Sequence, residues 1–142
     1  MDELTTPNVV RHVLVADRDP VGVERARAAL AGMDVEAVGT GPAALERLVG
    51  TAFDLLLIDP ALGDDDDGAL ALVHRVRTVV PDTVVVIWSP RPTVEFTVRA
   101  MRSGALDVLH KEAAPQEIRS VVDRAIQHGA RSTEVRRLGR YY

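Results

Sequence analysis

The sequence has 142 residues, no cysteine, a formal net charge of −4 and a pI near 5.5. This length suits one domain with a substantial core. The acidic balance argues against broad attraction to nucleic acid or anionic membrane. The lack of cysteine excludes disulfides and thiolate zinc sites. The chain has no signal-peptide run and no stretch of about 20 apolar residues. We therefore expect a soluble cytoplasmic domain that neither enters membranes nor binds nucleic acid directly.

Short apolar runs alternate with helical patterns along the whole chain. The runs predict five strands, at 12–16, 34–39, 54–58, 83–88 and 105–110. The helical patterns begin near Pro20, Pro42, residue 69, residue 93 and Pro115, and the fourth places Val94, Val98 and Met101 on one stripe. The segment 34–39 alternates as an edge strand does, whereas three other runs are apolar throughout, which is typical of strands buried on both faces. The expected fold is α/β, with a five-stranded parallel sheet covered by helices on both faces.

Chemically active side chains stand where four of the predicted strands end. Asp17 follows the first strand, Asp59 the third, Ser89 the fourth and Lys111 the fifth. Because ligands of such sheets bind at the carboxyl ends of the strands, we expect these side chains to lie close together. Paired carboxylates suit Mg²⁺, and a carboxylate can also accept a phosphoryl group to give an acyl phosphate. A metal ion and a lysine can supply the charge neutralisation that this transfer needs.

Four segments, in their order, resemble the receiver domains of two-component response regulators, from about residue 12 to residue 127. The segments are "VLVADRDP", "FDLLLIDPALGDDDDG", "VVVIWSP" and "GALDVLHKEAAPQEI". The resemblance implies a flavodoxin-like, doubly wound (βα)5 fold. It implies Asp59 as phosphoacceptor, Ser89 as switch hydroxyl and Lys111 as phosphoryl partner. It also implies a Mg²⁺ site made by Asp17, Asp59 and the backbone carbonyl of Ala61.

The resemblance further implies a phosphorelay role. A histidine kinase or phosphotransfer protein would donate the phosphoryl group, and the domain would be no enzyme beyond its own phosphorylation and dephosphorylation. The face made by the fourth helix, fifth strand and fifth helix would then bind a downstream protein, and it could support a homodimer. We divide the chain into an N-terminal extension (1–10), a receiver domain (11–128) and a flexible tail (129–142).

The chain departs from the receiver pattern beside the first acid. Such receivers usually carry a second acid there, which binds the metal, whereas this chain has Arg18. A guanidinium would repel Mg²⁺ and could pair with Asp59 or with a phosphoryl group. Glu112 also replaces a proline that often follows the lysine. The alternative function is therefore a pseudo-receiver, a protein-interaction module independent of phosphorylation in which Arg18 is a cation substitute held against Asp17 and Asp59.

Other signals have simpler interpretations. Asp19 is predicted as a helix cap, and the run 64–67 as a solvated acidic loop rather than a calcium site, because the twelfth position of such a site would be His74. The segment "GTGPAA" (39–44) fits a dinucleotide-binding pattern, but it follows an edge-like strand and carries Pro42 in the turn. Trp88 is predicted to pack on a helix, facing away from Ser89.

Overall fold

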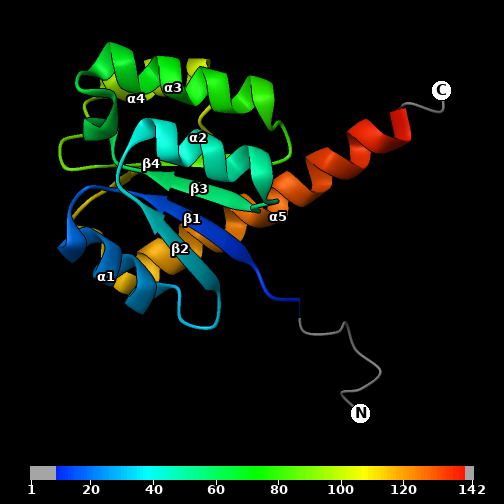
Figure 1. Cartoon of the computed structure of the whole chain (residues 1–142), viewed down its shortest axis with the longest axis horizontal. Helices are drawn as coiled ribbons and strands as arrows, with labels where there is room; N and C mark the ends of the chain where they lie inside the picture. The colour runs from blue at the N-terminus through cyan, green and yellow to red at the C-terminus, as the bar shows by residue number, and fades with distance from the viewer. Residues whose placement is uncertain (1–8, 140–142) are drawn as a thin grey trace.

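The computed structural model describes residues 9–139, which form a parallel sheet between two layers of helices (Figure 1). The strands are β1 (His12–Ala16), β2 (Asp34–Val38), β3 (Leu55–Ile58), β4 (Val84–Ser89) and β5 (Asp107–His110). Their order is β2-β1-β3-β4-β5, and every neighbouring pair is parallel. This is the flavodoxin-like order, so the predicted fold is confirmed, including the edge position of β2.

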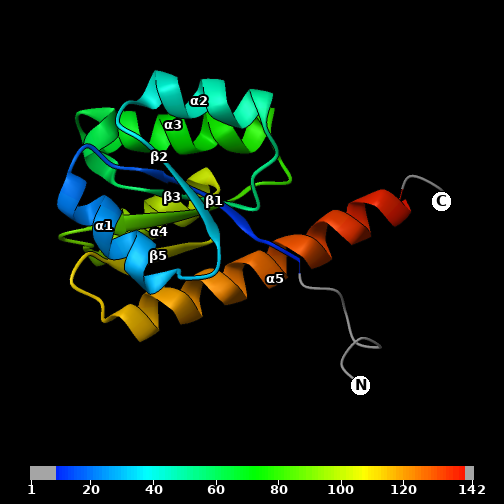
Figure 2. The ribbon, with the colours of Figure 1, turned by 60° about the horizontal axis from the view of Figure 1, so that its bottom comes forward.

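Helices cover both faces of the sheet. They are α1 (Pro20–Ala29), α2 (Gly41–Gly50), α3 (Asp66–Val79), α4 (Val94–Ser103) and α5 (Pro115–Gly139), and a 3₁₀ turn, η2 (Pro60–Gly63), follows β3. In Figure 2, α1 and α5 lie on one side of the sheet, and α2 and α3 lie on the other. The buried residues of α4 pack in the core on the α2 and α3 side. Alternate residues of β1 and β3 point into these two cores, which explains why both strands are apolar throughout.

Four helices begin at side-chain caps. Asp19, Thr40, Asp65 and Thr93 each accept a hydrogen bond from a backbone amide in the first turn of the helix that follows. The predicted cap at Asp19 is therefore confirmed. Because Asp65 caps α3, this helix begins inside the acidic run and not at residue 69 as the hydrophobic pattern suggested. Acids in a first turn interact favourably with the helix dipole.

The apolar stripe of α4 does not face the core. Val94, Val98 and Met101 are exposed, and Val94 keeps 82% of its surface accessible. The buried residues of this helix are Phe96 and Ala100. The fold therefore leaves an apolar stripe on the outer face of α4.

Helix α5 differs most from the sequence prediction. Residues 129–139, expected as a flexible tail, continue the helix, which runs past the edge of the sheet (Figures 1 and 2). The continuation contacts this end of the sheet: Gly129 packs so closely on Val84 that a β-carbon would not fit, and Arg136 pairs with Asp82. Within residues 9–139, no helix is long and apolar enough to cross a membrane. The predicted extension 1–10 lies outside this range except for two exposed valines, Val9 and Val10.

Candidate functional site

The candidate site lies where the winding of the sheet reverses. The chain leaves β1 towards α1 on one face and leaves β3 towards α3 on the other, so a crevice opens beyond their adjacent carboxyl ends. Asp17 directly follows β1 and Asp59 directly follows β3. The amide of Asp59 donates to the carbonyl of Ala16 at 2.9 Å, which holds the two strand ends side by side.

Lys111 bridges the two carboxylates. Its Nζ lies 2.6 Å from Oδ2 of Asp17 and 2.5 Å from Oδ2 of Asp59. The side chains of Lys111 and Asp59 are each 13% exposed and that of Asp17 is 4% exposed. The predicted convergence of these three residues is therefore present, and it is a largely buried cluster of two anions and one cation.

Backbone amides hold the Oδ1 oxygens of Asp17 and Asp59 in place. Oδ1 of Asp17 accepts from the amide of Asp19 at 2.9 Å, and Oδ1 of Asp59 accepts from the amide of Ala61 at 2.8 Å. Each carboxylate is thus held at one oxygen by the main chain and at the other by Lys111. These contacts fix the orientation of both carboxylates in the crevice.

Ser89 lies at the same edge of the sheet but not within the ion cluster. It ends β4 and is buried, and its Oγ accepts from the amide of Arg91 at 3.2 Å. Its carbonyl accepts from the amide of Lys111 at 2.8 Å. Within residues 9–139, the Ser89 hydroxyl makes no hydrogen bond to Asp59 or Lys111. The predicted switch hydroxyl is therefore linked to the lysine through the main chain alone.

Arg18 points away from the acids that it was expected to meet. Its guanidinium pairs with Asp64 at 3.2 Å, and both side chains are mostly exposed. The chain bends at residue 18, after the end of β1, so the Arg18 side chain leaves the crevice in which the Asp17 carboxylate lies. The cation held against Asp17 and Asp59 is Lys111, which corrects the expectation for Arg18.

The structure adds three residues, Gly22, Trp88 and Arg25, to which the sequence analysis gave no role in the site. Gly22 in α1 lies against the site, and a β-carbon there would overlap the carboxylate of Asp17. Trp88 is fully buried on the α1 and α5 side of the sheet, as its alternation with Ser89 predicts. The Lys111 ammonium lies over its ring, and Arg25 of α1 lies beside both. The sequence carries one indication that these two residues are special: Lys111 is its only lysine and Trp88 its only tryptophan.

Three of the four acids at 64–67 make contacts within the surrounding helices and loop. Asp65 caps α3, Asp64 pairs with Arg18, and Asp67 pairs with Arg99 of α4. The carboxylate of Asp67 raises the pKa of the Arg99 guanidinium. Among residues 9–139, no cluster of three or more acids, histidines or cysteines is arranged to hold a metal ion. Asp66 and Asp67 lie in the first turn of α3, so only Asp64 and Asp65 of this run lie in a loop.

The oxygen donors of the site suit Mg²⁺. The candidate ligands are the carboxylates of Asp17 and Asp59 and the backbone carbonyl of Ala61, and hard oxygen ligands are those that Mg²⁺ prefers. The Ala61 carbonyl accepts one hydrogen bond, from Asp64 at 3.1 Å, which leaves its second lone pair for a cation. These residues therefore fit the ion. The site has one carboxylate fewer than that of receivers with a second acid in the place of Arg18.

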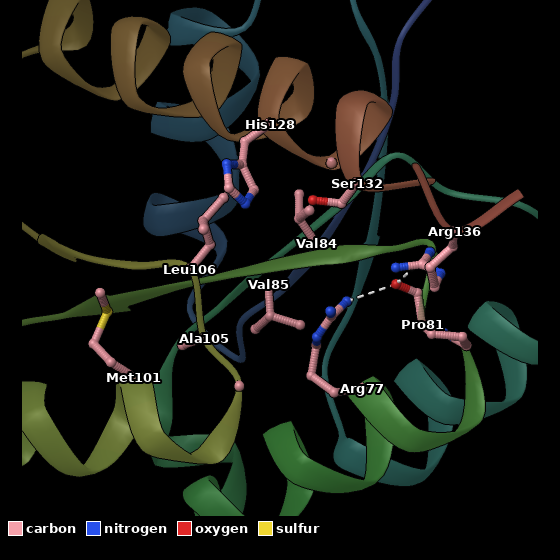
Figure 3. A pocket seen from close by; sticks show the side chains of 12 residues that line it. Arg77, Pro81, Val84, Val85, Met101, Ala105, Leu106, His128, Ser132 and Arg136 are labelled. Carbon is pink, nitrogen blue, oxygen red and sulfur yellow. Dashed lines mark hydrogen bonds between the residues drawn. The ribbon is translucent and has the colours of Figure 1, made fainter. Parts of the chain in front are cut away.

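A separate cavity of about 110 Å³ lies between α3, β4, the segment that joins α4 to β5, and α5 (Figure 3). Arg77 and Arg136 reach it from α3 and α5, and both donate to the carbonyl of Pro81. Burial and the neighbouring Arg136 lower the pKa of Arg77. Arg136 thus fastens the α5 extension, and Arg77 the end of α3, to the turn before β4, at the opposite end of the strands from Asp59.

Known proteins resemble this chain over most of its length. The profile of the family described as "Response regulator receiver domain" matches residues 13–123. LuxO, the luminescence regulatory protein of Vibrio campbellii, is 32% identical over 96 residues, which are 68% of this chain and 21% of LuxO. AlgB, the alginate biosynthesis transcriptional regulatory protein of Pseudomonas aeruginosa, is 32% identical over 107 residues, 75% of this chain and 22% of AlgB. The chain thus spans about a fifth of these relatives.

Solved structures show the same architecture. NtrX from Brucella abortus, crystallised with ADP, superimposes with a TM-score of 0.80 and 26% identity, covering 92% of this chain and 29% of NtrX. A response regulator from Thermotoga maritima superimposes with a TM-score of 0.77 and 22% identity, covering 84% of this chain and 99% of the other. The second likeness supports the fold alone.

Proposed function

Because this chain belongs to the response regulator receiver domain family, we propose that Asp59 accepts a phosphoryl group from a histidine kinase or a phosphotransfer protein. Receiver domains generally have this role, bind Mg²⁺ at the phosphorylation site and act with output domains. The observation that carries the proposal is the Lys111 ammonium on Oδ2 of Asp59, in a crevice that also holds Asp17. We place this activity in the cytoplasm, where response regulators typically act.

The proposed chemistry uses few groups. The Asp59 carboxylate attacks the phosphorus of a phosphohistidine, a P–O bond forms, and the P–N bond breaks with its electron pair left on the imidazole. Lys111 neutralises charge on the transferring group. Asp17, Asp59 and the Ala61 carbonyl would hold a Mg²⁺ ion, which supplies further charge neutralisation when bound. The domain turns over no other substrate in this proposal.

The charge of a phosphoryl group on Asp59 would change the positions of Ser89, at the end of β4, and Lys111, after β5. Ser89 and Lys111 share a main-chain hydrogen bond, so a shift of either side chain towards a phosphoryl group acts on both strand ends. Next to β5, the stripe of Val94, Val98 and Met101 on α4 is exposed. We propose the α4–β5–α5 face as the surface that meets a downstream protein or a second copy of the chain.

A second candidate rests on Arg18. This residue places a cation where receivers usually carry a metal-binding acid, and it pairs with Asp64 on the surface. In a pseudo-receiver, the Asp17–Lys111–Asp59 cluster would be a permanent structural element, and the α4–β5–α5 face would act without phosphorylation.

One experiment tests the leading proposal. The protein is incubated with Mg²⁺ and a small phosphodonor, and its intact mass is measured. We expect a gain of one phosphoryl group in the parent and in Asp66→Asn, an exposed acid in the first turn of α3, and no gain in Asp59→Asn. An unchanged parent mass would contradict the proposal.

A Mg²⁺ titration followed through Trp88 fluorescence separates the two candidates. Removing the Arg18 cation and adding a carboxylate, in Arg18→Asp, should raise Mg²⁺ affinity on the order of tenfold or more, because each close charge pair contributes about 1 kcal/mol even in water. A pseudo-receiver predicts that the parent binds Mg²⁺ negligibly at millimolar concentrations. Clear binding by the parent in that range would count against the pseudo-receiver.

A further inference from the structure

The Lys111 ammonium lies against an aromatic ring. Its Nζ lies over the Trp88 ring, 4.4 Å from the ring centroid, and Trp88 has no accessible surface. Trp88 stands in β4 immediately before Ser89, and its side chain projects to the α1 and α5 side of the sheet. The ammonium is therefore enclosed by the ring on one side and by the carboxylates of Asp17 and Asp59 on the other. This arrangement is a cation–π contact in a site largely removed from water.

Arg25 holds the backbone of the same lysine. Its Nη1 donates to the carbonyl of Lys111 at 2.5 Å and its Nη2 to the carbonyl of Ala113 at 3.2 Å. The guanidinium carbon lies 5.5 Å from the centroid of the Trp88 ring. One arginine of α1 thus ties the loop between β5 and α5 at two carbonyls, in a segment where Glu112 follows the lysine.

We propose that Trp88 and Arg25 are positioning residues that hold the Lys111 ammonium against the phosphoacceptor carboxylate. This inference rests on the proposed function of Asp59. A lysine has a flexible four-carbon side chain whose ammonium is a compact charge without fixed direction. The ring of Trp88 limits where that charge can lie, and Arg25 fixes the backbone from which the side chain extends. In this account Arg25 of α1 influences the reactivity of Asp59 through Lys111.

The composition of the chain agrees with a dedicated role. Lysine and arginine together number 17 and Lys111 is the only lysine, so the other 16 cations are arginines. The single ammonium thus stands at the one place where two carboxylates and an aromatic face converge. Within residues 9–139, the indole nitrogen of Trp88 has no hydrogen-bond partner, so packing and the two cations hold the ring.

The single lysine makes the contact directly measurable. In protein labelled only at lysine, the side-chain NMR resonances belong to Lys111 alone. We expect the resonances of the protons next to Nζ to be shifted upfield by the ring current of Trp88. Trp88→Phe keeps an aromatic face and should retain part of the shift, whereas Trp88→Leu keeps an apolar side chain without a face and should abolish it. A parent shift equal to that of free lysine would overturn the contact with Trp88.

The kinetic test compares rate constants for phosphorylation by a small phosphodonor at saturating Mg²⁺. Loss of a desolvated cation–π contact predicts that Trp88→Leu reacts slower by on the order of tenfold, with Trp88→Phe between it and the parent. Arg25→Met should also react slower, with partial rescue in Arg25→Lys. Arg27→Met is the matched control, because Arg27 lies on the same helix and donates to the carbonyl of Val35. It should react like the parent.

The two measurements separate failure of this inference from failure of the proposed function. A parent that takes up no phosphoryl group refutes the role of Asp59, and the lysine resonances then decide the contact alone. If the parent reacts, and both Trp88→Leu and Arg25→Met react at its rate, the positioning role is refuted. Circular dichroism identifies any variant that fails to fold. If Trp88→Leu or Arg25→Met fails to fold, the phosphorylation rate constants of Trp88→Phe and Arg25→Lys are compared with that of the parent. Rate constants below that of the parent support the positioning role, and rate constants equal to it refute the role.

Discussion

Removing the charge of Lys111 should destabilise the fold. Two unit charges 2.6 Å apart at an effective dielectric constant of about 20 attract by about 6 kcal/mol. Burial of the ions offsets much of that attraction, and loss of one partner of a buried pair typically costs about 3–5 kcal/mol. With Asp17 and Lys111 only 4% and 13% exposed, we expect Lys111→Met to lower the free energy of unfolding by about 3 kcal/mol. Two carboxylates would then face each other without a counter-ion.

A double-mutant cycle measures this interaction. Urea unfolding is followed by circular dichroism for the parent, Lys111→Met, Asp59→Asn and the double variant. We expect Lys111→Met to cost less in the Asp59→Asn background, with a coupling of about 1–3 kcal/mol. Arg18→Met is the matched control, because the exposed Arg18–Asp64 pair should contribute at most about 1 kcal/mol. Equal costs of Lys111→Met in both backgrounds would refute a buried charge cluster.

Three further changes test the site and its surroundings. Gly22→Ala would displace the carboxylate of Asp17, so we expect weaker Mg²⁺ binding in a fluorescence titration with the fold unchanged. The guanidinium of Arg47 lowers the pKa of Glu36, so this pair stabilises the fold above the unfolded-state pKa and loses its effect as pH falls through the folded-state value. Glu36→Gln should therefore lose less stability than the parent between about pH 5 and pH 3 in urea unfolding. Gly129→Ala would overlap β4 and should cost about 1–3 kcal/mol in the same assay.

Each of the predictions for Gly22→Ala, Glu36→Gln and Gly129→Ala has an outcome that would contradict it. Gly50→Ala is the control for both glycine variants, because a β-carbon there meets open space, and it should change stability by less than about 1 kcal/mol. Parent-like Mg²⁺ binding by Gly22→Ala would remove Gly22 from the site. A parent-like pH profile for Glu36→Gln would mean that its ion pair is not formed in solution. A neutral Gly129→Ala would contradict the packing of α5 on β4.

The strand ends were predictable from sequence because parallel strands buried on both faces read as uninterrupted apolar runs. Two such strands, β1 and β3, are directly followed by Asp17 and Asp59. Lys111 follows β5, which pairs with the apolar strand β4. The sheet topology brings the three side chains to one crevice. The direction of Arg18 was not predictable, because it depends on which way the loop after β1 turns. The position of Trp88 under Lys111 depends in the same way on how α1 and α5 pack, which periodicity does not specify.

The two largest differences have a common physical cause. Hydrophobic periodicity reports that a helix has an apolar stripe, but not what covers it, so it does not show that the stripe of Val94, Val98 and Met101 is exposed. Beyond residue 128, α5 lacks such a stripe, yet Gly129 allows close packing and Arg136 pairs with Asp82. Long-range contacts of single residues therefore continue a helix that no local pattern predicted.

The most direct test identifies the modified residue itself. Protein treated with Mg²⁺ and a phosphodonor is reduced with borohydride, which converts an aspartyl phosphate to homoserine, and its peptides are mapped by mass spectrometry. Our account predicts homoserine at Asp59 and at no other aspartate. Homoserine within residues 64–67 in place of Asp59, or none at any position, would contradict it.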